Sequence, residues 1–406
     1  MRNFSSRYHL IPVIPFEEII MSYGEGSHLF DANGRKFLDL NAGQFCTVLG
    51  HSNKEILNSI WDSISKLAHT STNIVTSDVI SCSENIHKIS GDMKASSIIL
   101  STGAEVVEFC LRYAKFIRKK NGIICFDRGY HGLTLGAQSV TFSGVYARPN
   151  VTEIYSIPVP SVEEIQTSID CLRKLIKNNE IAAVLLEPIV SVGGMLFPPV
   201  EWFQEVRLLC DKQQVLLLLD ECQTGFGRTG NWFAYQTFKF VPDMVAAAKG
   251  VGLGFPVSVA MFRDALISEG TDYSMTHYSS HQNDSFAACV INAGIEYIEK
   301  NNLLFGIQEK ASYFLRQLKD LEQRNCHLIN VRGCGLMLGA DLSFDTDDYR
   351  KIYTRLYRRM MEHGVIIQGT NGGRTLRFLP DYLIKLTDID YAIDILYKVL
   401  LTEVLS

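Results

Sequence analysis

Residues 215–230 read VLLLLDECQTGFGRTG, and this stretch decides the fold. Five apolar residues end on Asp220, and a Gly-rich polar segment follows them. A continuous apolar run of this length, closed by turn residues, is typical of a strand buried on both faces of a parallel sheet. Asp220 would then lie at the carboxyl end of the strand, where open α/β sheets bind their ligands. The alternative is that Asp220 only caps the next helix or turn.

The next apolar run along the chain ends on a lysine. Residues 243–250 read DMVAAAKG, which predicts a second buried strand with Lys249 at its end. A desolvated lysine has a lowered pKa, which suits an amine that forms a Schiff base. Pyridoxal phosphate requires such a lysine for its aldehyde and an aspartate that keeps its pyridine nitrogen protonated. Lys249 could instead extend from a strand edge into solvent, but its pairing with Asp220 favours the cofactor site.

Composition limits the class of protein. The chain has 406 residues, enough for two domains, with 47% hydrophobic and 20% charged residues, as in soluble globular proteins. A formal charge of −5 gives no basic footprint for nucleic acid. Ten cysteines without CxxC or zinc-type spacing indicate a reducing compartment. We find no signal-peptide pattern and no apolar run near the roughly 20 residues that cross a bilayer, so we expect a cytoplasmic protein without a membrane partner.

The order of predicted elements gives the fold class. Residues 1–28 are expected to form an extended arm, and residues 29–40 a hairpin around an Asn-Gly turn. Strands and helices alternate over about 97–261, which predicts a mostly parallel, doubly wound α/β sheet. A long helix over 303–321 and a strand–helix–strand–helix tail complete the chain. We therefore expect a small domain built from residues 1–50 and 301–406, and a large domain over 51–300.

Three segments carry a family resemblance. They read LLEPIVSVGG (185–194), LLLDECQTGFGRTG (217–230) and AAAKGVGLGFP (246–256). In this order they resemble class III pyridoxal-phosphate aminotransferases of fold type I, over about residues 29–396. The resemblance implies a homodimer with active sites at the subunit interface. It also implies amino-group transfer from an amine or amino acid to a 2-oxo acid through a Schiff base on Lys249.

The resemblance assigns the phosphate and ring contacts of the cofactor. A predicted strand ends at Thr102, and Gly103 and Ala104 then open a helix, whose free N–H groups suit a phosphate. By resemblance Gly103 and Ala104 hold the phosphate with Thr102 nearby, although the segment could be an ordinary turn. Tyr130 takes the position of the aromatic residue that stacks on the ring; it could also be a core anchor. Ser280 matches the residue that reaches the partner's phosphate.

Four more residues are placed around the ring by resemblance. Glu187 supports the site beneath the ring, near Gln223. Gln223 hydrogen-bonds the phenolic oxygen of the cofactor. Cys222 packs on the ring face as a small hydrophobic residue without chemistry of its own. His131 matches a structural position and is not expected to carry protons.

One departure from the family pattern narrows the subclass of aminotransferase. Ornithine and 4-aminobutyrate aminotransferases have a glutamate where this chain has Val192, and that glutamate neutralises an arginine that binds carboxylates. Arg377, in the segment TLRFLP, matches this arginine. Without the glutamate it is expected to bind a substrate α-carboxylate through two hydrogen bonds. Arg377 could also be a plain surface residue on a strand.

Two other segments resemble 2,2-dialkylglycine decarboxylase, a class III relative. Gln44 matches a glutamine that hydrogen-bonds the carboxylate released as carbon dioxide, so decarboxylation-dependent transamination is the alternative function. Gln44 could also simply line a transaminase pocket. Thr72, Ser280 and Asp284 match in type the ligands of a K⁺ or Na⁺ ion, which prefers hard oxygen atoms.

Two unrelated classes are weaker explanations. The glycines of KGVGLGFP lack the helix and the acidic residue of a dinucleotide fingerprint. A binding or regulatory protein without catalysis would not need Lys249, Asp220 and Gln223 together.

Overall fold

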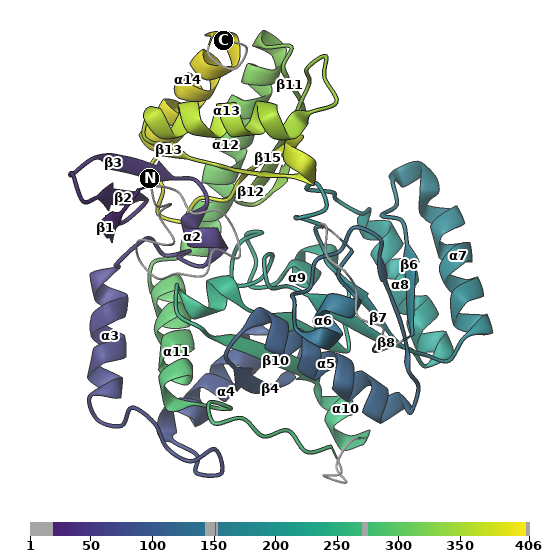
Figure 1. Ribbon diagram of the computed structural model, residues 1–406. Coiled ribbons are helices and arrows are strands. Elements are labelled where there is room, and N and C mark those ends of the chain that lie inside the picture. Colours follow the sequence, from purple (N-terminus) through teal and green to yellow (C-terminus); the bar gives the residue numbers. More distant parts are fainter. Residues whose placement is uncertain (1–18, 143–150, 152, 270–274, 403–406) are drawn as a thin grey trace, which may run out of the picture.

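The computed structural model describes residues 19–142, 151, 153–269 and 275–402. Within these ranges the chain forms a large α/β domain and a smaller α+β domain. The large domain occupies the lower part of Figure 1 and the small domain lies at the top. Most of the expected N-terminal arm, residues 1–18, lies outside the described residues. No described helix combines the length and the apolar character that crossing a bilayer requires.

The large domain is built on a seven-stranded sheet. Its strands follow the order β4 (Ala95–Leu100), β10 (Ser258–Arg263), β9 (Met244–Ala247), β8 (Leu216–Asp220), β7 (Ile181–Leu186), β5 (Gly122–Phe126) and β6 (Ile154–Ile157). The strands from β9 to β6 are parallel to one another, whereas β10 is antiparallel to both β4 and β9. The predicted mostly parallel sheet is therefore confirmed.

Helices cover both faces of this sheet. They are α3 (Lys54–Ile64), α4 (Ser77–Ile89), α5 (Gly103–Arg118), α6 (Leu135–Ser139), α7 (Ile165–Asn178), α8 (Val200–Gln213), α9 (Ala234–Phe238), α10 (Asp264–Glu269) and α11 (Ser285–Lys300). Strand β8 shows why its sequence is continuously apolar. Leu216 and Leu218 belong to the core that includes α5, whereas Leu217 and Leu219 belong to the core that includes α8. Because side chains alternate along a strand, both faces must be apolar.

The small domain has a core of its own. It contains α12 (Leu303–Arg324), β11 (Leu328–Cys334), β12 (Met337–Leu342), α13 (Tyr349–Glu362), β13 (Val365–Ile366), β14 (Gln368–Thr370), β15 (Thr375–Phe378) and α14 (Leu386–Thr402). The expected strand–helix–strand–helix tail is wrong in detail, because β11 and β12 form a hairpin that turns at Gly335, which has a φ of 57°. Strands β11, β12, β15 and β14 make one antiparallel sheet.

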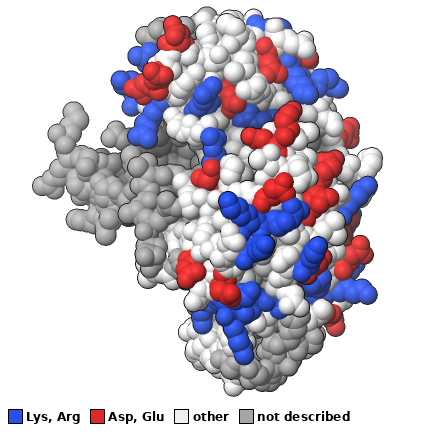
Figure 2. Space-filling model, turned by 90° about the vertical axis from the view of Figure 1, so that its right-hand side faces the viewer, with Lys and Arg blue, Asp and Glu red and all other residues white. Residues whose placement is uncertain are grey.

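The N-terminal strands pair with a strand from the C-terminal part of the chain. Strands β1 (Met21–Glu25), β2 (His28–Asp31) and β3 (Lys36–Asp39) pair antiparallel, and β3 then pairs with β13 from the far end of the chain. The exact boundaries at residues 50 and 300 stay a prediction. On the face shown in Figure 2, acidic and basic side chains of the described residues are interspersed.

Candidate active site

The predicted pair of strand ends meets at one cavity. Strands β8 and β9 are parallel, with Asp220 opposite Ala246, so Asp220 and the residues after Ala247 reach the same edge of the sheet. Asp220 and Lys249 both line a cavity of about 390 Å³. The other lining residues named from the sequence are Thr102, Gly103, Ala104, Tyr130, His131 and Cys222. The loops after four strands, β4, β5, β8 and β9, therefore converge at this cavity, as a doubly wound sheet predicts.

Lys249 begins a short 3₁₀ helix, Lys249–Gly252, and has a φ of 51°. This left-handed conformation is uncommon for a residue other than glycine and is often found at functional sites. The side chain is half-buried. Among the described residues, none forms a hydrogen bond or an ion pair with its amine. The amine is therefore available inside the cavity for a ligand.

Asp220 is held by a histidine that the sequence analysis treated as structural. His131 Nδ1 lies 2.7 Å from Asp220 Oδ2, and both side chains are buried. The other oxygen, Oδ1, accepts a hydrogen bond from Cys222 N at 3.0 Å. Burial favours a raised pKa for Asp220, but the hydrogen bond and charge of His131 and the charge of Lys249 outweigh it, so the pKa is lowered. Asp220 is thus kept as a carboxylate.

The pKa of His131 is raised, as expected of an imidazole that contacts a carboxylate. Burial favours a lower value, but the hydrogen bond to Asp220 and its charge outweigh burial and raise the pKa. The His131 Nε2 atom is buried without a partner among the described residues. The two groups form a buried hydrogen-bonded pair that spans 89 positions of the sequence. No local pattern in the sequence could have revealed it.

The two adjacent acids of the segment DECQTG have different environments. Glu221 Oε1 and Oε2 accept hydrogen bonds from the N–H groups of Tyr235 and Ala234, at 3.0 and 2.7 Å, and Oε2 also accepts one from Thr224. Burial raises its pKa to about 7, although these hydrogen bonds oppose the shift. Glu221 therefore caps α9, whereas Asp220 lines the cavity.

Glu187 connects the aromatic loop to the sheet. It lies directly after β7, is buried, and its Oε1 accepts a hydrogen bond from Tyr130 N at 2.8 Å. Burial raises its pKa to about 7, while the charges of His131 and Lys249 oppose the shift. Gln223 Oε1 is buried without a partner among the described residues. The expected roles of Glu187 and Gln223 at the ring stay predictions.

The turn before α5 has the features expected of a phosphate site. Thr102 Oγ1 accepts a hydrogen bond from Glu105 N at 3.2 Å and so caps the helix. No described group accepts a hydrogen bond from the N–H groups of Gly103 or Ala104. A Cβ on Gly103 would lie 3.4 Å from both Ala248 Cβ and Cys222 Sγ, so the turn is tightly packed against the ends of β8 and β9. These N–H groups are oriented by the start of a helix, which favours an anion.

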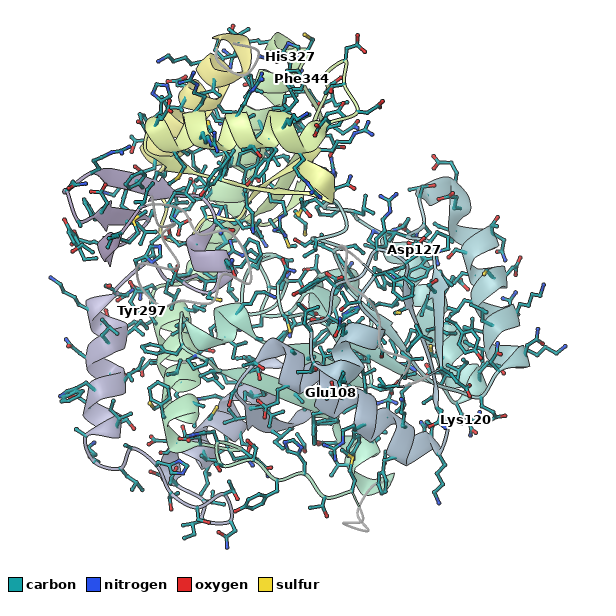
Figure 3. The ribbon with its side chains drawn as sticks, in the orientation of Figure 1. Glu108, Lys120, Asp127, Tyr297, His327 and Phe344 are labelled. Carbon is teal, nitrogen blue, oxygen red and sulfur yellow. The ribbon has the colours of Figure 1, made fainter. Side chains whose placement is uncertain are left out.

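The loop that carries Tyr130 and His131 is anchored on α5 as well. Glu108 of α5, labelled in Figure 3, accepts hydrogen bonds from Gly136 N and Ala137 N at the start of α6, at 2.9 and 3.1 Å to Oε2. Its Oε2 also accepts a hydrogen bond from Thr134 Oγ1 at 2.6 Å. The helix that begins at the phosphate turn therefore also fixes the loop that contacts Asp220.

Arg377 is a buried cation without an acidic partner. It lies on β15 and is 4% exposed. Nη1 donates to Ser191 Oγ at 3.0 Å, and Cζ lies 5.0 Å from the centre of the Phe45 ring. No carboxylate of the described residues forms an ion pair with it, and Nε has no partner among them. Burial lowers its pKa to about 10, which Glu187 partly opposes. Arg377 is not the plain surface residue that the sequence left open.

Gln44 lies on a strained turn beside this arginine. Ala42, Gly43, Gln44 and Phe45 all have positive φ values, from 43° to 71°. Asp39 stabilises the turn, since its Oδ2 accepts from Gly43 N at 2.8 Å and contacts His51 Nε2 at 2.9 Å. The Gln44 side chain is exposed. Cys46, which follows this turn, lines the same cavity as Lys249.

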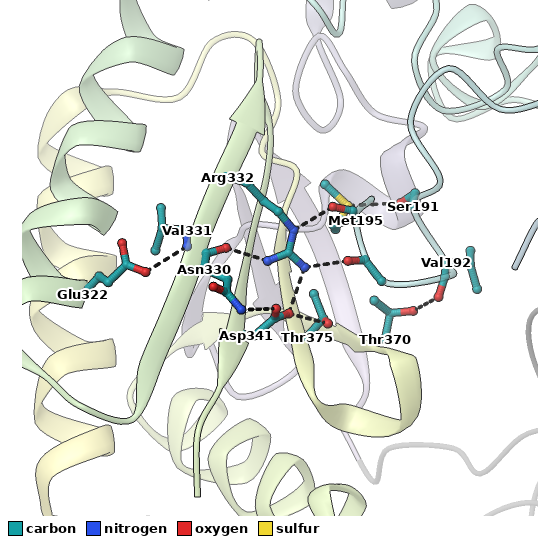
Figure 4. A network of polar contacts seen from close by, with 11 residues as sticks. Ser191, Val192, Met195, Glu322, Asn330, Val331, Arg332, Asp341, Thr370 and Thr375 are labelled. Atoms are coloured by element: carbon teal, nitrogen blue, oxygen red, sulfur yellow. Dashed lines mark hydrogen bonds and ion pairs between the residues drawn. The ribbon is translucent and has the colours of Figure 1, made fainter. Parts of the chain in front are cut away.

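The loop after Glu187 is held by the small domain. Arg332 of β11 donates to Gly194 O at 2.6 Å and to Met195 O at 2.7 Å, and it pairs with Asp341 at 2.8 Å (Figure 4). Thr370 Oγ1 donates to Val192 O, and Ser191 accepts from Arg377. No sequence motif identifies Arg332, because the acceptors of its hydrogen bonds in this loop are backbone atoms 137 and 138 positions away in the chain.

The predicted alkali-ion residues form no hydrogen bonds with one another within the described part of the chain. Thr72 is half-buried, Ser280 is exposed, and neither hydrogen-bonds to Asp284 among the described residues. Instead His69 and His281 contact the Asp284 carboxylate. The roles proposed for Thr72 and for Ser280, including contact with a partner's phosphate, stay predictions.

Comparison with known proteins gives the class. The family model of class-III aminotransferases matches residues 14–400, so the chain belongs to this family of pyridoxal-phosphate-dependent transaminases. An acetylornithine aminotransferase of Methanosarcina mazei is 31% identical over 382 residues, covering 94% of this chain and 91% of that protein. The LysW-aminoadipate semialdehyde/glutamate semialdehyde transaminase of Sulfolobus acidocaldarius is also 31% identical, covering 93% and 94%.

A solved structure confirms the fold. The PMP-bound aminotransferase of Vibrio fluvialis aligns with a TM-score of 0.89 at 19% identity, over 98% of this chain and 97% of that one. The prediction of a fold-type-I class III aminotransferase is therefore confirmed.

Proposed function

We propose that the chain moves an amino group from a carboxylate-bearing amine or amino acid to a 2-oxo acid, with Lys249 as the residue that holds pyridoxal phosphate. One observation carries this proposal: Lys249 and Asp220 come from adjacent parallel strands and line the same cavity. The residues around them fit the cofactor, since unpaired N–H groups of Gly103 and Ala104 suit its phosphate and the Asp220 carboxylate suits its pyridine nitrogen.

Each side chain then has a defined task. The bound cofactor supplies an electron sink beside the substrate amine. Asp220, kept charged by His131, holds the proton on the ring nitrogen. Lys249 would hold the cofactor and, when free, would serve as the general base and acid that moves a proton at the substrate carbon. Tyr130, Cys222 and Gln223 are the side chains that would hold the ring in place.

The proposed substrate class follows from Arg377. A buried guanidinium with one hydroxyl partner and no carboxylate is costly, unless a ligand supplies the anion. A substrate carboxylate that binds to the guanidinium of Arg377 would offset the cost of desolvation through a charge-assisted hydrogen bond. The relatives named above are transaminases of acetylornithine and of aminoadipate and glutamate semialdehydes, which supports an amino acid derivative as one substrate.

Decarboxylation-dependent transamination is the second candidate, and the turn at residues 42–45 favours it. Four successive positive φ values are maintained by Asp39, and such strain commonly persists where a side chain must be presented to a ligand. The turn places Gln44 next to Phe45, which packs on Arg377. In this candidate Gln44 hydrogen-bonds the carboxylate that leaves.

We also propose a homodimer. Ile74, Val75 and Ile80 are exposed apolar side chains in one segment, as expected of a surface that a second copy covers.

The deciding experiment compares L-alanine with 2-aminoisobutyrate, which has no α-hydrogen. Each is added to the holoenzyme, and the absorbance of the lysine-bound cofactor is followed together with carbon dioxide release. Conversion by alanine or another amine, without conversion by 2-aminoisobutyrate, supports plain transamination. Carbon dioxide release from 2-aminoisobutyrate establishes the second candidate. Lys249→Ala is the control and should turn over neither compound; turnover by this variant would contradict both candidates.

A further inference from the structure

The two carboxylate oxygens of Asp284 have different partners. Oδ1 accepts a hydrogen bond from Phe286 N at 2.9 Å and so caps α11. Oδ2 lies 2.8 Å from His69 Nδ1 and 2.6 Å from His281 Nδ1. The carboxylate is 5% exposed, whereas the two imidazoles are 47% and 65% exposed. The anion is therefore fixed inside the protein, and the two rings cover it from the solvent side.

The three side chains come from two places in the chain, since His281 and Asp284 lie three residues apart and His69 is distant in sequence. His69 belongs to the segment between α3 and α4, and His281 to the turn before α11. Their rings are 5.0 Å apart between centres, with planes tilted by 48°. Their ligand atoms and that of Asp284 all lie within 4.8 Å of one another. No lysine or arginine of the described residues forms an ion pair with Asp284, so the two imidazoles are the basic side chains among them that contact its carboxylate.

We propose that His69, His281 and Asp284 bind one divalent transition-metal ion of the Zn²⁺ type, through the two Nδ1 atoms and Oδ2. Two imidazoles and one carboxylate form a donor set that Zn²⁺ accepts, and the exposed side leaves a coordination position for water. K⁺ and Na⁺ prefer oxygen atoms alone, so this donor set selects against the alkali ion that the sequence suggested. None of the three residues lines the cavity of Lys249, so the proposal does not rest on the proposed function.

The site joins three elements beside the phosphate turn. Asn283, between His281 and Asp284, pairs with Ile99 of β4: Asn283 N donates to Ile99 O, and Ile99 N donates to Asn283 Oδ1, both at 2.9 Å. Strand β4 leads directly to Thr102 and Gly103. A bound ion would link the α3–α4 segment to the start of α11 and, through Asn283, to the end of β4. The ion would therefore connect these segments around the phosphate turn, with water in its remaining coordination position.

The chain allows variants that remove a ligand without removing the fold. Asp284→Asn keeps a good helix cap, because asparagine caps helices as well as aspartate does, yet it removes the anionic oxygen. His69→Asn and His281→Asn remove one imidazole each from an exposed position. His327→Asn is the matched control: His327 lies in the small domain, where its ring stacks on Phe344 with centres 4.3 Å apart (Figure 3).

The experiment is calorimetric titration of Zn²⁺ into chelator-treated holoenzyme, with thermal unfolding measured in parallel. We expect one equivalent of Zn²⁺ per chain and a higher Tm on binding, because a ligand that binds only the folded state stabilises it. Each of the three ligand variants should weaken binding by more than the roughly 10–100-fold that loss of a partner behind a metal ligand costs. His327→Asn should bind as the wild type does.

Three results would overturn the proposal. One is the absence of stoichiometric Zn²⁺ binding to the wild type. Another is binding that survives unchanged in all three ligand variants. The third is a rise in Tm with K⁺ or Na⁺ that Zn²⁺ does not reproduce, which would restore the alkali ion.

Discussion

Asp220 and Arg377 are both buried ionisable side chains near the candidate site, but among the described residues only Asp220 has an ionisable partner. Asp220 contacts His131 at 2.7 Å, and this contact lowers its pKa against the effect of burial. The side chain of Arg377 hydrogen-bonds only to the Ser191 hydroxyl within the described part of the chain, and burial lowers its pKa to about 10. The carboxylate of Asp220, which has a partner inside the fold, is suited to a cofactor that stays bound. The guanidinium of Arg377, which has no acidic partner among the described residues, is suited to a substrate that binds and dissociates.

Replacing Asp220 by asparagine tests the paired charge and should have the largest effect. The amide cannot hold a proton on the ring nitrogen electrostatically, so we expect kcat to fall by roughly 10²–10⁴-fold, the range for a positioned acid–base group. The cofactor should remain bound, since Lys249 and the phosphate turn are intact. Stopped-flow kinetics together with cofactor absorbance measure both quantities. A kcat within about twofold of the wild type would show that another group protonates the ring.

Arg377→Met tests the unpaired charge. Loss of one member of a buried charged contact costs about 2–5 kcal/mol, so kcat/KM for carboxylate-bearing donors should fall by roughly 30-fold or more. An amine without a carboxylate should react at nearly the wild-type rate. The free energy of unfolding without substrate should not fall, because methionine removes an uncompensated buried cation. Steady-state kinetics with both donors, and urea denaturation, check these outcomes. Equal losses for both donors would mean that Arg377 has only a structural role.

Glu187 should show the smallest effect, because it influences both charges without pairing with either. Its pKa is raised from 4.5 to about 7 in the folded protein, mainly by burial. The folded state therefore binds more protons than the unfolded state between these values, and Glu187 reduces stability as pH rises from about 4.5 to about 7. Glu187→Gln stays neutral and can still accept from Tyr130 N. We expect the variant to gain stability relative to the wild type over this window, up to ~1–3 kcal/mol.

Denaturation of both proteins at several pH values between 4.5 and 8 measures that difference. A difference that does not change with pH would mean that the carboxyl of Glu187 titrates in the folded protein as it does in the unfolded chain.

The sequence predicted the elements whose signals are local. The apolar run ending on Asp220 and the shorter run ending near Lys249 identified β8 and β9, because a strand covered on both faces must be continuously apolar. The Asn-Gly turn identified the hairpin of β2 and β3. The antiparallel direction of β10 was not visible, since strand direction depends on the path of the chain between strands and not on the strand residues.

Contacts between distant residues were the part that the sequence could not supply. His131 and Asp220, Arg332 and the 191–195 loop, and the two imidazoles on Asp284 each join residues from different elements. Each side chain alone has an ordinary alternative role. The resemblance located Lys249, Asp220 and Arg377 by motif, but it did not say which charges would find partners inside the fold.

The attachment of the 191–195 loop by Arg332 has a consequence for how selectivity can change. Ser191 contacts Arg377, yet the loop that carries Ser191 is held by hydrogen bonds from β11, whose guanidinium is oriented by Asp341. A substitution at Asp341 would leave Arg377 and the residues that line the cavity unchanged and still shift Ser191, the hydroxyl partner of Arg377 among the described residues. Selection for a new substrate could therefore retain changes on the outer sheet, far from the reacting atoms, as readily as changes in the pocket lining.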